Sequence, residues 1–145
     1  MATASTSMPT DPITVEEGAS GPESAVGPIT RITISKYAGA GGDFNPVHVD
    51  EEFARSAGMP SVFAHGLLSA GLLGQYLAQW VGQANVRKFG VRFTGQVWPD
   101  DTLTISGRVE SIEDVDGERL ANIVLGAARQ TGDVVVKGTA VARVA

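Results

Sequence analysis

The chain has 145 residues, of which 43% are hydrophobic and 19% charged, and its formal net charge is −5. This length fits one domain with a sizeable core, and the acidic balance argues against a surface that binds nucleic acid. The absence of cysteine excludes disulfides, thiolate metal sites and thiol nucleophiles, and it fits a reducing compartment, so we expect a cytoplasmic protein.

The beginning of the chain predicts a tail followed by one domain. Residues 1–11, MATASTSMPTD, are small and polar, and they lack the basic and apolar regions of a secretory signal. We expect a disordered tail over 1–11 and a single domain over 12–145. Residues 12–30 are rich in Gly, Pro, Ser and Glu, which favours loop with room for one strand. The next segment, RITISKYAG, fits a strand or a helix equally well.

Two further helices are predicted. VDEEFARSAG (49–58) is typical of a short helix, with Asp50 as its cap and Gly58 at its end. Residues 64–82 have apolar side chains around most of a helical circumference, which predicts a helix wrapped by other structure. Its polar residues and glycines argue against a membrane span. Gly66, Ala70 and Gly74 form a small-residue ridge that permits a close backbone approach or leaves space for a ligand.

The last third of the chain alternates with the period of a strand. Four segments show it: 89–97, 102–111, 120–128 and 134–144. Turn residues separate them at 99–101, 114–117 and 131–133. We therefore predict an α+β fold, in which an antiparallel meander of about four strands curls around the long helix.

The segment YAGAGGDFNPVHVD (37–50) invites several interpretations. A dinucleotide loop needs a glycine where Phe44 stands, and a calcium loop that begins at Asp43 needs Gly and Glu where His48 and Ala54 stand. A zinc site of His48, His65 and a carboxylate matches no standard ligand spacing. We therefore expect neither a metal nor a cofactor.

Two interpretations of this segment stay open on the residues alone. Asp-x-Asn-Pro after Gly-Gly is good material for a surface turn. Alternatively, Asp43 and His48 face one cleft across the turn stiffened by Pro46, where a carboxylate and an imidazole could together hold one water for acid/base catalysis.

A resemblance favours the second interpretation. YAGAGGDFNPVHVD, followed by FAHGLLSAG, resembles the hydratase-2 motif of the MaoC-like (R)-specific enoyl-thioester hydratases and dehydratases. The shared core is Gly-Asp-x-Asn-Pro-aliphatic-His-x-Asp at 42–50, and the helix start is Ala-His-Gly-Leu at 64–67. The likeness covers about residues 26–145 and includes VRFTGQVWPDDTL (91–103). It implies a hot-dog fold, a curved antiparallel sheet around one long helix.

The resemblance also implies an activity and site residues. The activity is reversible syn hydration of trans-2-enoyl thioesters to (R)-3-hydroxyacyl thioesters, carried on coenzyme A or acyl carrier protein, as in fatty acid metabolism. Asp43 and His48 correspond to the catalytic pair, and the backbone N–H of Gly66 to the oxyanion donor. We assign Asn45 to fixing the loop and Asp43, although a turn role fits equally well. His65 corresponds to a structural or substrate-lining residue.

Alternatives to this reading concern the reaction and the partner. A hot-dog thioesterase shares the fold and the substrate class, but thioesterases normally lack the Asp-x-Asn-Pro-x-His motif. A homodimer is expected, and a heterodimer with a related hot-dog chain is the other arrangement, in which this chain would be the active subunit. Arg92 and the Arg87-Lys88 pair are weak candidates for a phosphate of the carrier. Acyl chain length, carrier and direction are left open.

Overall fold

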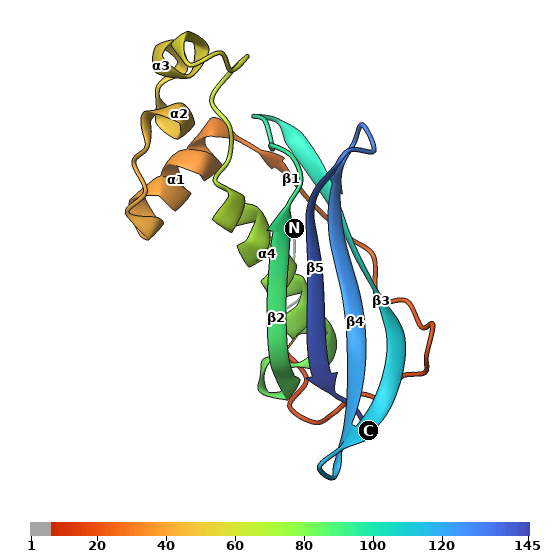
Figure 1. Cartoon of the computed structure of the whole chain (residues 1–145). Helices are drawn as coiled ribbons and strands as arrows, with labels where there is room; N and C mark the ends of the chain where they lie inside the picture. Colours follow the sequence, from red (N-terminus) through yellow and green to blue (C-terminus); the bar gives the residue numbers. More distant parts are fainter. Residues whose placement is uncertain (1–6) are drawn as a thin grey trace.

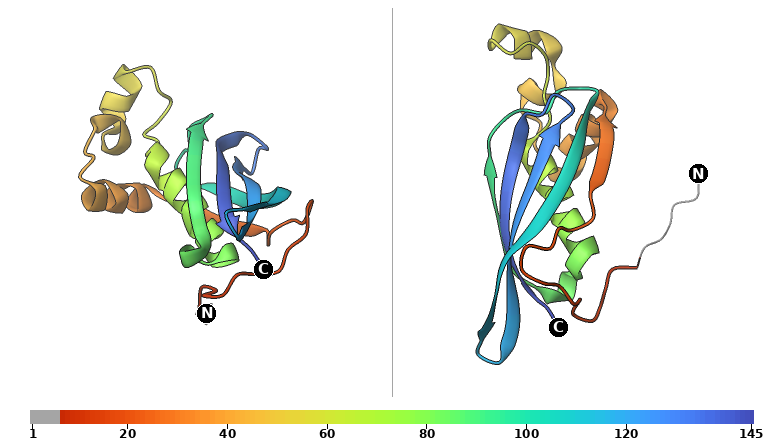
Figure 2. Two further views of the ribbon diagram at one scale, coloured as in Figure 1. Left: turned by 60° about the horizontal axis from the view of Figure 1, so that its bottom comes forward. Right: turned by 90° about the vertical axis from the view of Figure 1, so that its right-hand side faces the viewer.

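The computed structural model describes residues 7–145, and its centre is one antiparallel sheet (Figures 1 and 2). The strand order is β1-β3-β4-β5-β2. The strands are β1 (Ser24–Ile29), β2 (Val86–Phe93), β3 (Asp101–Val115), β4 (Glu118–Arg129) and β5 (Val134–Arg143). β1 is the strand for which the loop-rich segment 12–30 left room.

The long helix α4 (Gly66–Val81) packs along one face of the curved sheet and contacts β2, β3, β4 and β5 (Figure 2). Its residues Leu73, Leu77 and Val81 are fully buried and belong to one cluster with the inward side chains of the sheet. Burying one such side chain stabilises a fold by roughly 1.5–3 kcal/mol. The arrangement is the expected hot-dog fold, with one face of the helix buried against the sheet and the opposite face exposed.

Three shorter helices form an arm beside the sheet, which we call the helical arm (residues 31–56; Figure 1). They are α1 (Arg31–Gly41), α2 (Pro46–Val49) and α3 (Glu51–Ser56). The ambiguous segment RITISKYAG is therefore helical, because Thr30 caps α1 by accepting from Thr33 N–H and Gly42 ends it in the left-handed region. Asp50 caps α3, as predicted, by accepting from Phe53 N–H.

The small-residue ridge of α4 allows the helix to lie close to β2. A methyl group on Gly66 would lie 3.1 Å from Cε1 of Phe93, and one on Gly74 would lie 3.4 Å from Cε1 of Phe89. The aromatic side chains of β2 thus occupy the room that the glycines leave. Within residues 7–145, no helix has the length and apolar character needed to cross a membrane.

The predicted four-strand meander is wrong in one respect. β3, β4 and β5 follow one another, but β2 pairs with β5 and not with β3. The strand β2 ends at Phe93, so Val97, which the predicted alternating segment included, lies outside it. The connection from 94 to 100 crosses to other partners instead: Val97 O accepts from Ala64 N–H, and Asp100 N–H donates to Ile29 O, both at 2.8 Å. β1 occupies the edge of β3 that β2 would have needed.

The expected tail over 1–11 lies partly outside the described residues, which begin at 7. Pro9 lies against Gly82 at the end of α4, and the Asp11 carbonyl accepts a hydrogen bond from the Asn85 amide at 3.3 Å. Residues 9–11 are therefore packed on the domain. The boundary between tail and domain stays a prediction.

Candidate active site

Asp43 lies in the short link between α1 and α2, where the chain turns sharply. Gly42 has a φ of 70°, which a glycine adopts without strain. The backbone N–H of Asn45 donates to Asp43 Oδ1, and Asn45 Oδ1 accepts from Val47 N–H, both at 3.2 Å. Asn45 therefore caps α2 and restrains the Asp43 carboxylate at once. The side chain of Asp43 is 56% exposed, so water reaches it.

His48 is held by a hydrogen bond that decides which ring nitrogen is free. Its Nδ1 lies 2.7 Å from the backbone carbonyl oxygen of Phe63. Because a carbonyl only accepts, Nδ1 carries the proton, and the neutral ring presents a lone pair at Nε2. The ring is buried, and the edge of the Phe63 ring packs against it at 4.9 Å between centroids. This is the tautomer that a general base at Nε2 requires.

His65 is the residue just before α4, and it packs against His48. The two imidazole rings lie 3.9 Å apart at 30°, and Tyr37 packs against His65 at 5.0 Å. His65 Nε2–H donates to the backbone carbonyl of Asp43 at 2.9 Å. It does not cap α4 through its side chain. Its Nδ1 is buried and has no hydrogen-bond partner among residues 7–145.

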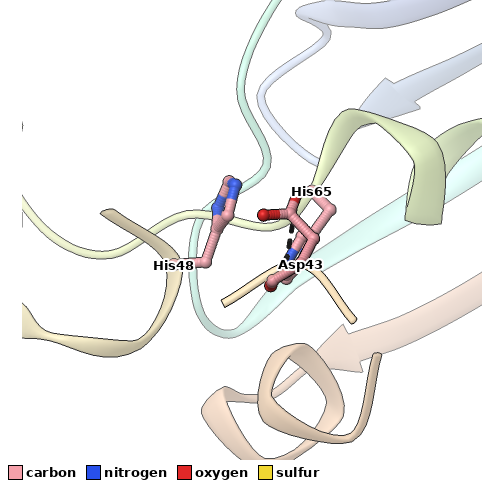
Figure 3. Close-up of side chains that lie close together, drawn as sticks. All are labelled: Asp43, His48 and His65. Atoms are coloured by element: carbon pink, nitrogen blue, oxygen red, sulfur yellow. Dashed lines mark hydrogen bonds and ion pairs between the residues drawn. The ribbon is translucent and has the colours of Figure 1, made fainter. Parts of the chain in front are cut away.

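The structure brings the three side chains Asp43, His48 and His65 together (Figure 3). Each offers a potential ligand atom, and these atoms lie within 4.8 Å of one another. One nitrogen of each ring donates to a backbone carbonyl, which leaves the other nitrogen free. The cluster can therefore hold a water molecule by hydrogen bonds to the Asp43 carboxylate and to Nε2 of His48. That no metal is needed stays a prediction.

A cavity of about 410 Å³ opens beside these side chains. We call it the catalytic cavity; besides Asp43, His48 and His65, it is lined by Tyr37, Gly41, Asn45, Val47, Phe63, Gly66, Leu67 and Phe93. Gly66 begins α4, and no side chain caps this end of the helix. The first N–H groups of a helix carry a partial positive charge and favour a negatively charged ligand atom. The cavity therefore joins a carboxylate, an imidazole and an anion-stabilising helix end.

Some sequence-predicted residues lie elsewhere, and some lining residues were missed. Arg87 forms an ion pair with Glu118 at 2.6 Å, and neither Lys88 nor Arg92 lines the catalytic cavity. Sequence reasoning gave no role to Phe63, whose carbonyl orients His48, although it directly precedes the Ala-His-Gly helix start. Its contribution is a backbone atom, which no side-chain pattern reveals.

The helical arm is attached to the rest of the site through Glu51. Its carboxylate accepts from Arg31 Nη1 at 2.7 Å, Ser61 Oγ at 3.1 Å and Val62 N–H at 3.3 Å. The hydrogen bond from Arg31, with that from Val62, lowers the pKa of Glu51 to about 2. One carboxylate thus ties α3 to α1 and to the segment that leads into Phe63.

A second polar cluster holds the connection between β2 and β3. Asp101, buried at the start of β3, accepts from Arg129 Nε at 2.6 Å, Gln130 Nε2 at 2.7 Å and Trp98 N–H at 2.7 Å. Burial by itself would raise the pKa of the Asp101 carboxyl, but these hydrogen bonds outweigh it and the pKa is lowered. The carboxylate is therefore the form that stabilises this turn.

Comparison with known proteins places the fold and the motif in a family. A family model described as MaoC-like domain matches residues 14–129. Enoyl-CoA hydratase ChsH3 of Mycobacterium tuberculosis is 34% identical over 100 residues, which are 67% of this chain and 32% of that protein. The fatty acid synthase beta subunit TOXC of Cochliobolus carbonum is 33% identical over 107 residues, 72% of this chain and 5% of that protein. The chain therefore spans a third or less of these relatives.

Two solved structures superpose on nearly the whole chain. A chain of the ChsH1-ChsH2 complex from Mycobacterium tuberculosis has a TM-score of 0.78 at 26% identity, covering 91% of this chain and 100% of that one. The (R)-hydratase PhaJ1 from Pseudomonas aeruginosa has a TM-score of 0.77 at 26% identity, covering 90% and 83%. Since the family model spans most of the domain and the fold agrees throughout, the chain belongs to the family of proteins with a MaoC-like domain.

Proposed function

We propose that this protein is a hydro-lyase that adds water reversibly to trans-2-enoyl thioesters and forms (R)-3-hydroxyacyl thioesters. The observation that carries the proposal is the meeting of Asp43 and His48 in one cavity with the uncapped start of α4. Hydration of an enoyl thioester needs these three parts: a group that takes a proton from water, a route for a proton to C2, and a donor for the thioester oxygen.

His48 acts as the base in this scheme. Its Nε2 lone pair accepts a proton from the water while the water oxygen forms a bond to C3 and the electrons of the double bond move onto the thioester oxygen. The imidazolium then returns the proton to C2 from the same face, which makes the addition syn. Asp43 accepts a hydrogen bond from the second O–H of the water, which stays on C3 as the hydroxyl group, and it stabilises the transient imidazolium, for which its exposed carboxylate is close enough.

The backbone N–H of Gly66 donates to the thioester oxygen as negative charge builds there. The N-terminal position of Gly66 on α4 supports this role, since the helix dipole favours an anion at that end. Gly66 lines the catalytic cavity, and Phe93 packs over the position where a side chain would stand. Asn45 keeps the Asp43 loop in place, and His65 supports His48 through ring stacking.

The substrate class is supported by the names of the relatives. ChsH3 is an enoyl-CoA hydratase and PhaJ1 an (R)-hydratase, and both resemble this chain over most of its length. The (R) stereochemistry, the water-activating pair and the oxyanion donor are part of the proposal for this chain. Neither relative indicates the acyl length.

We also propose that the protein works as a dimer of hot-dog chains. β2 is an edge strand, and Phe89 and Phe93 on it are exposed, as are Phe44 and Leu67 near the catalytic cavity. Exposed apolar residues gathered around one edge are typical of a protein interface. The ChsH1-ChsH2 complex supports association with a related chain. Sedimentation analysis tests this, and a stable monomer at working concentrations would contradict it.

The test of the reaction uses crotonyl-CoA and the purified protein. We expect loss of the enoyl thioester absorbance and formation of (R)-3-hydroxybutyryl-CoA, resolved by chiral chromatography. A thiol reagent in a parallel sample detects free CoA. Release of CoA without a hydroxyacyl product would replace the proposal with a thioesterase. Hydration to the (S) product would contradict the stereochemistry alone.

A further inference from the structure

The peptide group that joins Phe63 to Ala64 makes a hydrogen bond on each of its two sides. Its carbonyl oxygen accepts from His48 Nδ1 at 2.7 Å. Its N–H, which belongs to Ala64, donates to the carbonyl oxygen of Val97 at 2.8 Å. A trans peptide group is planar, so its C=O and its N–H point in opposite directions. The hydrogen bond to Val97 therefore fixes the direction in which the carbonyl meets the His48 ring.

The peptide group that joins Val97 to Trp98 continues the same line. Its carbonyl accepts from the Ala64 N–H, and its N–H, which belongs to Trp98, donates to Asp101 Oδ2 at 2.7 Å. Three hydrogen bonds thus lead from the His48 ring to the Asp101 carboxylate, and the donor of each one faces the carboxylate end. We call this set the Asp101–His48 network; its members are His48, the peptide group of Phe63 and Ala64, the peptide group of Val97 and Trp98, and Asp101.

The Asp101–His48 network is shielded from water. Ala64, Val97 and Asp101 are 4%, 2% and 3% exposed, and His48 is buried as well. Hydrogen bonds that follow one another in a protein interior polarise and strengthen each other. Because Arg129 pairs with the Asp101 carboxylate at 2.6 Å, much of the negative charge is balanced. We therefore expect the network to act by aiming the last carbonyl more than by a long-range field.

Aromatic side chains connect the same segments. The Trp98 ring packs against the Phe63 ring with 5.8 Å between centroids, and the edge of the Phe63 ring packs against His48 at 4.9 Å. At the far end, Arg129 of β4 donates to the Asp101 carboxylate at 2.6 Å and fixes it to the sheet. The connection between β2 and β3 therefore holds the segment before α4 through its backbone and through its side chains.

We propose that Asp101 is a positioning residue for His48. By holding the Trp98 N–H it aims the Phe63 carbonyl at His48 Nδ1, which keeps the proton there and leaves the Nε2 lone pair free for water. A carboxylate that orients a catalytic imidazole usually contacts the ring directly, whereas here two peptide groups stand between them. Asp101 does not line the catalytic cavity, so it acts through His48 and not on the substrate. The effect on turnover rests on the proposed hydratase function, but the tautomer is a property of the free protein.

The kinetic experiment uses Asp101→Ala in the full chain. We expect kcat for crotonyl-CoA to fall about tenfold, less than the roughly 10²-fold that a misplacement of a full ångström costs. KM should stay at the wild-type value, because no contact with substrate is lost. Asp133→Ala removes an exposed carboxylate that pairs with the same Arg129 but lies outside the network, and it should keep the wild-type kcat. Wild-type kcat in folded Asp101→Ala would overturn the proposal.

The spectroscopic experiment needs no substrate. The chain has two histidines, so long-range ¹H–¹⁵N correlation spectra contain four ring nitrogens, and the spectrum of His48→Gln assigns them. We expect the wild type to hold His48 protonated at Nδ1 and Asp101→Ala to show a mixture of both tautomers. Asn85→Ala, which removes another buried polar side chain, controls for a general loss of stability and should keep the single tautomer. An unchanged tautomer in Asp101→Ala, or an equal mixture in Asn85→Ala, would contradict the inference.

A third measurement uses the wild type alone and holds even if Asp101→Ala does not fold. Scalar couplings across hydrogen bonds should join the Ala64 nitrogen to the Val97 carbonyl carbon and the Trp98 nitrogen to the Asp101 carboxyl carbon. Couplings across the paired strands β3 and β4 serve as the internal reference. If these appeared and either of the two expected couplings did not, the network would be refuted. Absence of hydration with the couplings and the tautomer in place would refute the proposed reaction instead.

Discussion

The two ends of α4 differ in whether their polar groups have hydrogen-bond partners within the fold. At the end that begins with Gly66, no side chain caps the helix, and His65 Nδ1 is buried without a partner among the described residues. Two cavities of about 410 Å³ each open around this end. Unsatisfied polar groups and open space therefore coincide.

At the other end of α4, the buried polar side chain has hydrogen-bond partners for both its donor and its acceptor. Asn85, which is fully buried, donates from Nδ2 to Val81 O at 2.8 Å and to Asp11 O at 3.3 Å. Its Oδ1 accepts from Nε and Nη2 of Arg143 at 3.3 and 3.1 Å. One side chain thus joins the helix end, the N-terminal segment and β5.

This difference between the two ends of α4 indicates that the polar groups at one end stabilise the fold, while those at the other end are left to bind a ligand. A fold that satisfies Asn85 through four hydrogen bonds has the means to satisfy the polar groups at its other helix end. Orphaned buried polar groups are rare, and each calls for an explanation. We infer that the start of α4 is incomplete without substrate and that the end of α4 is complete without it. Substitutions at the two ends should therefore affect different measurements.

The largest effect is expected for the proposed catalytic pair. Asp43→Asn and His48→Gln should each lower kcat for crotonyl-CoA by about 10²- to 10⁴-fold, the contribution of a positioned general acid or base. His48→Gln keeps a side-chain amide of similar reach but no titratable ring. Melting temperature and oligomeric state should stay close to those of the wild type. Near-normal turnover by both variants would remove these residues from the mechanism.

A smaller effect on activity is expected for Gly66→Ala. The added methyl group would lie 3.1 Å from the Phe93 ring, so the ring or the helix start must shift by a few tenths of an ångström. Because the oxyanion donor moves with it, kcat/KM should fall by between about 10- and 100-fold.

Gly71→Ala is the matched control for this substitution. It lies on the same helix, and a methyl group there meets nothing within 4 Å. Removing an exposed helical glycine should leave kcat/KM unchanged and stabilise the protein by up to about 1 kcal/mol. Urea unfolding and steady-state kinetics on both variants check this. Equal activity of the two variants would mean that Gly66 is not close to the reacting carbonyl.

The closed end of α4 should respond in stability alone. Asn85→Ala removes the partner of Arg143 and of the Val81 carbonyl, so the free energy of unfolding should fall by about 1–3 kcal/mol. Urea titration measures it, while kcat/KM of the still folded fraction should match the wild type. A loss of turnover without a loss of stability would contradict the division between the two ends.

Side-chain patterns predicted the helices and strands of this fold better than they predicted which strands lie side by side. α4 follows from apolar residues on most of its circumference, and β3 to β5 follow from alternation between turns. Alternation shows which face of a strand is buried but not which strand lies beside it, so the position of β2 next to β5 could not be read from it. The segment of α1 stayed ambiguous because its apolar spacing fits both periods.

For the site, the motif identified the side chains that gather, and the structure supplied their environment. Asp43 and His48 stand out through the Gly-Asp-x-Asn-Pro-x-His pattern and lie in one cluster. The Phe63 carbonyl that orients His48 belongs to the backbone, and the isolation of His65 Nδ1 depends on what surrounds it after folding. Neither property leaves a trace in residue types or spacing.

The smallest effect concerns how the helical arm is held beside the open end of α4, and it depends on pH. The hydrogen bond from Arg31 is the chief reason that the pKa of Glu51 is lowered from its ordinary value of 4.5 to about 2 in the folded protein. A lowered pKa means that this carboxylate stabilises the arm fully above about pH 4.5 and loses the contribution as the pH falls toward 2. Because the side chains of Arg31 and Glu51 are 55% and 33% exposed, solvent screens the pair and the gain is small.

Glu51→Gln should therefore loosen the arm at pH 7 and leave the sheet intact. We expect faster limited proteolysis within 42–62 and a modest fall in kcat/KM, while the urea midpoint of the domain changes little. As the pH falls from about 4.5 toward 2, the wild type should approach the behaviour of the variant, because the loosened arm takes up the proton at the ordinary pKa of a glutamate. Glu52→Gln, an exposed neighbour in the same helix turn, is the control and should leave the proteolysis rate unchanged. If both variants were cleaved at the wild-type rate at pH 7, the contacts of Glu51 would not be what keeps Asp43 and His48 at the start of α4.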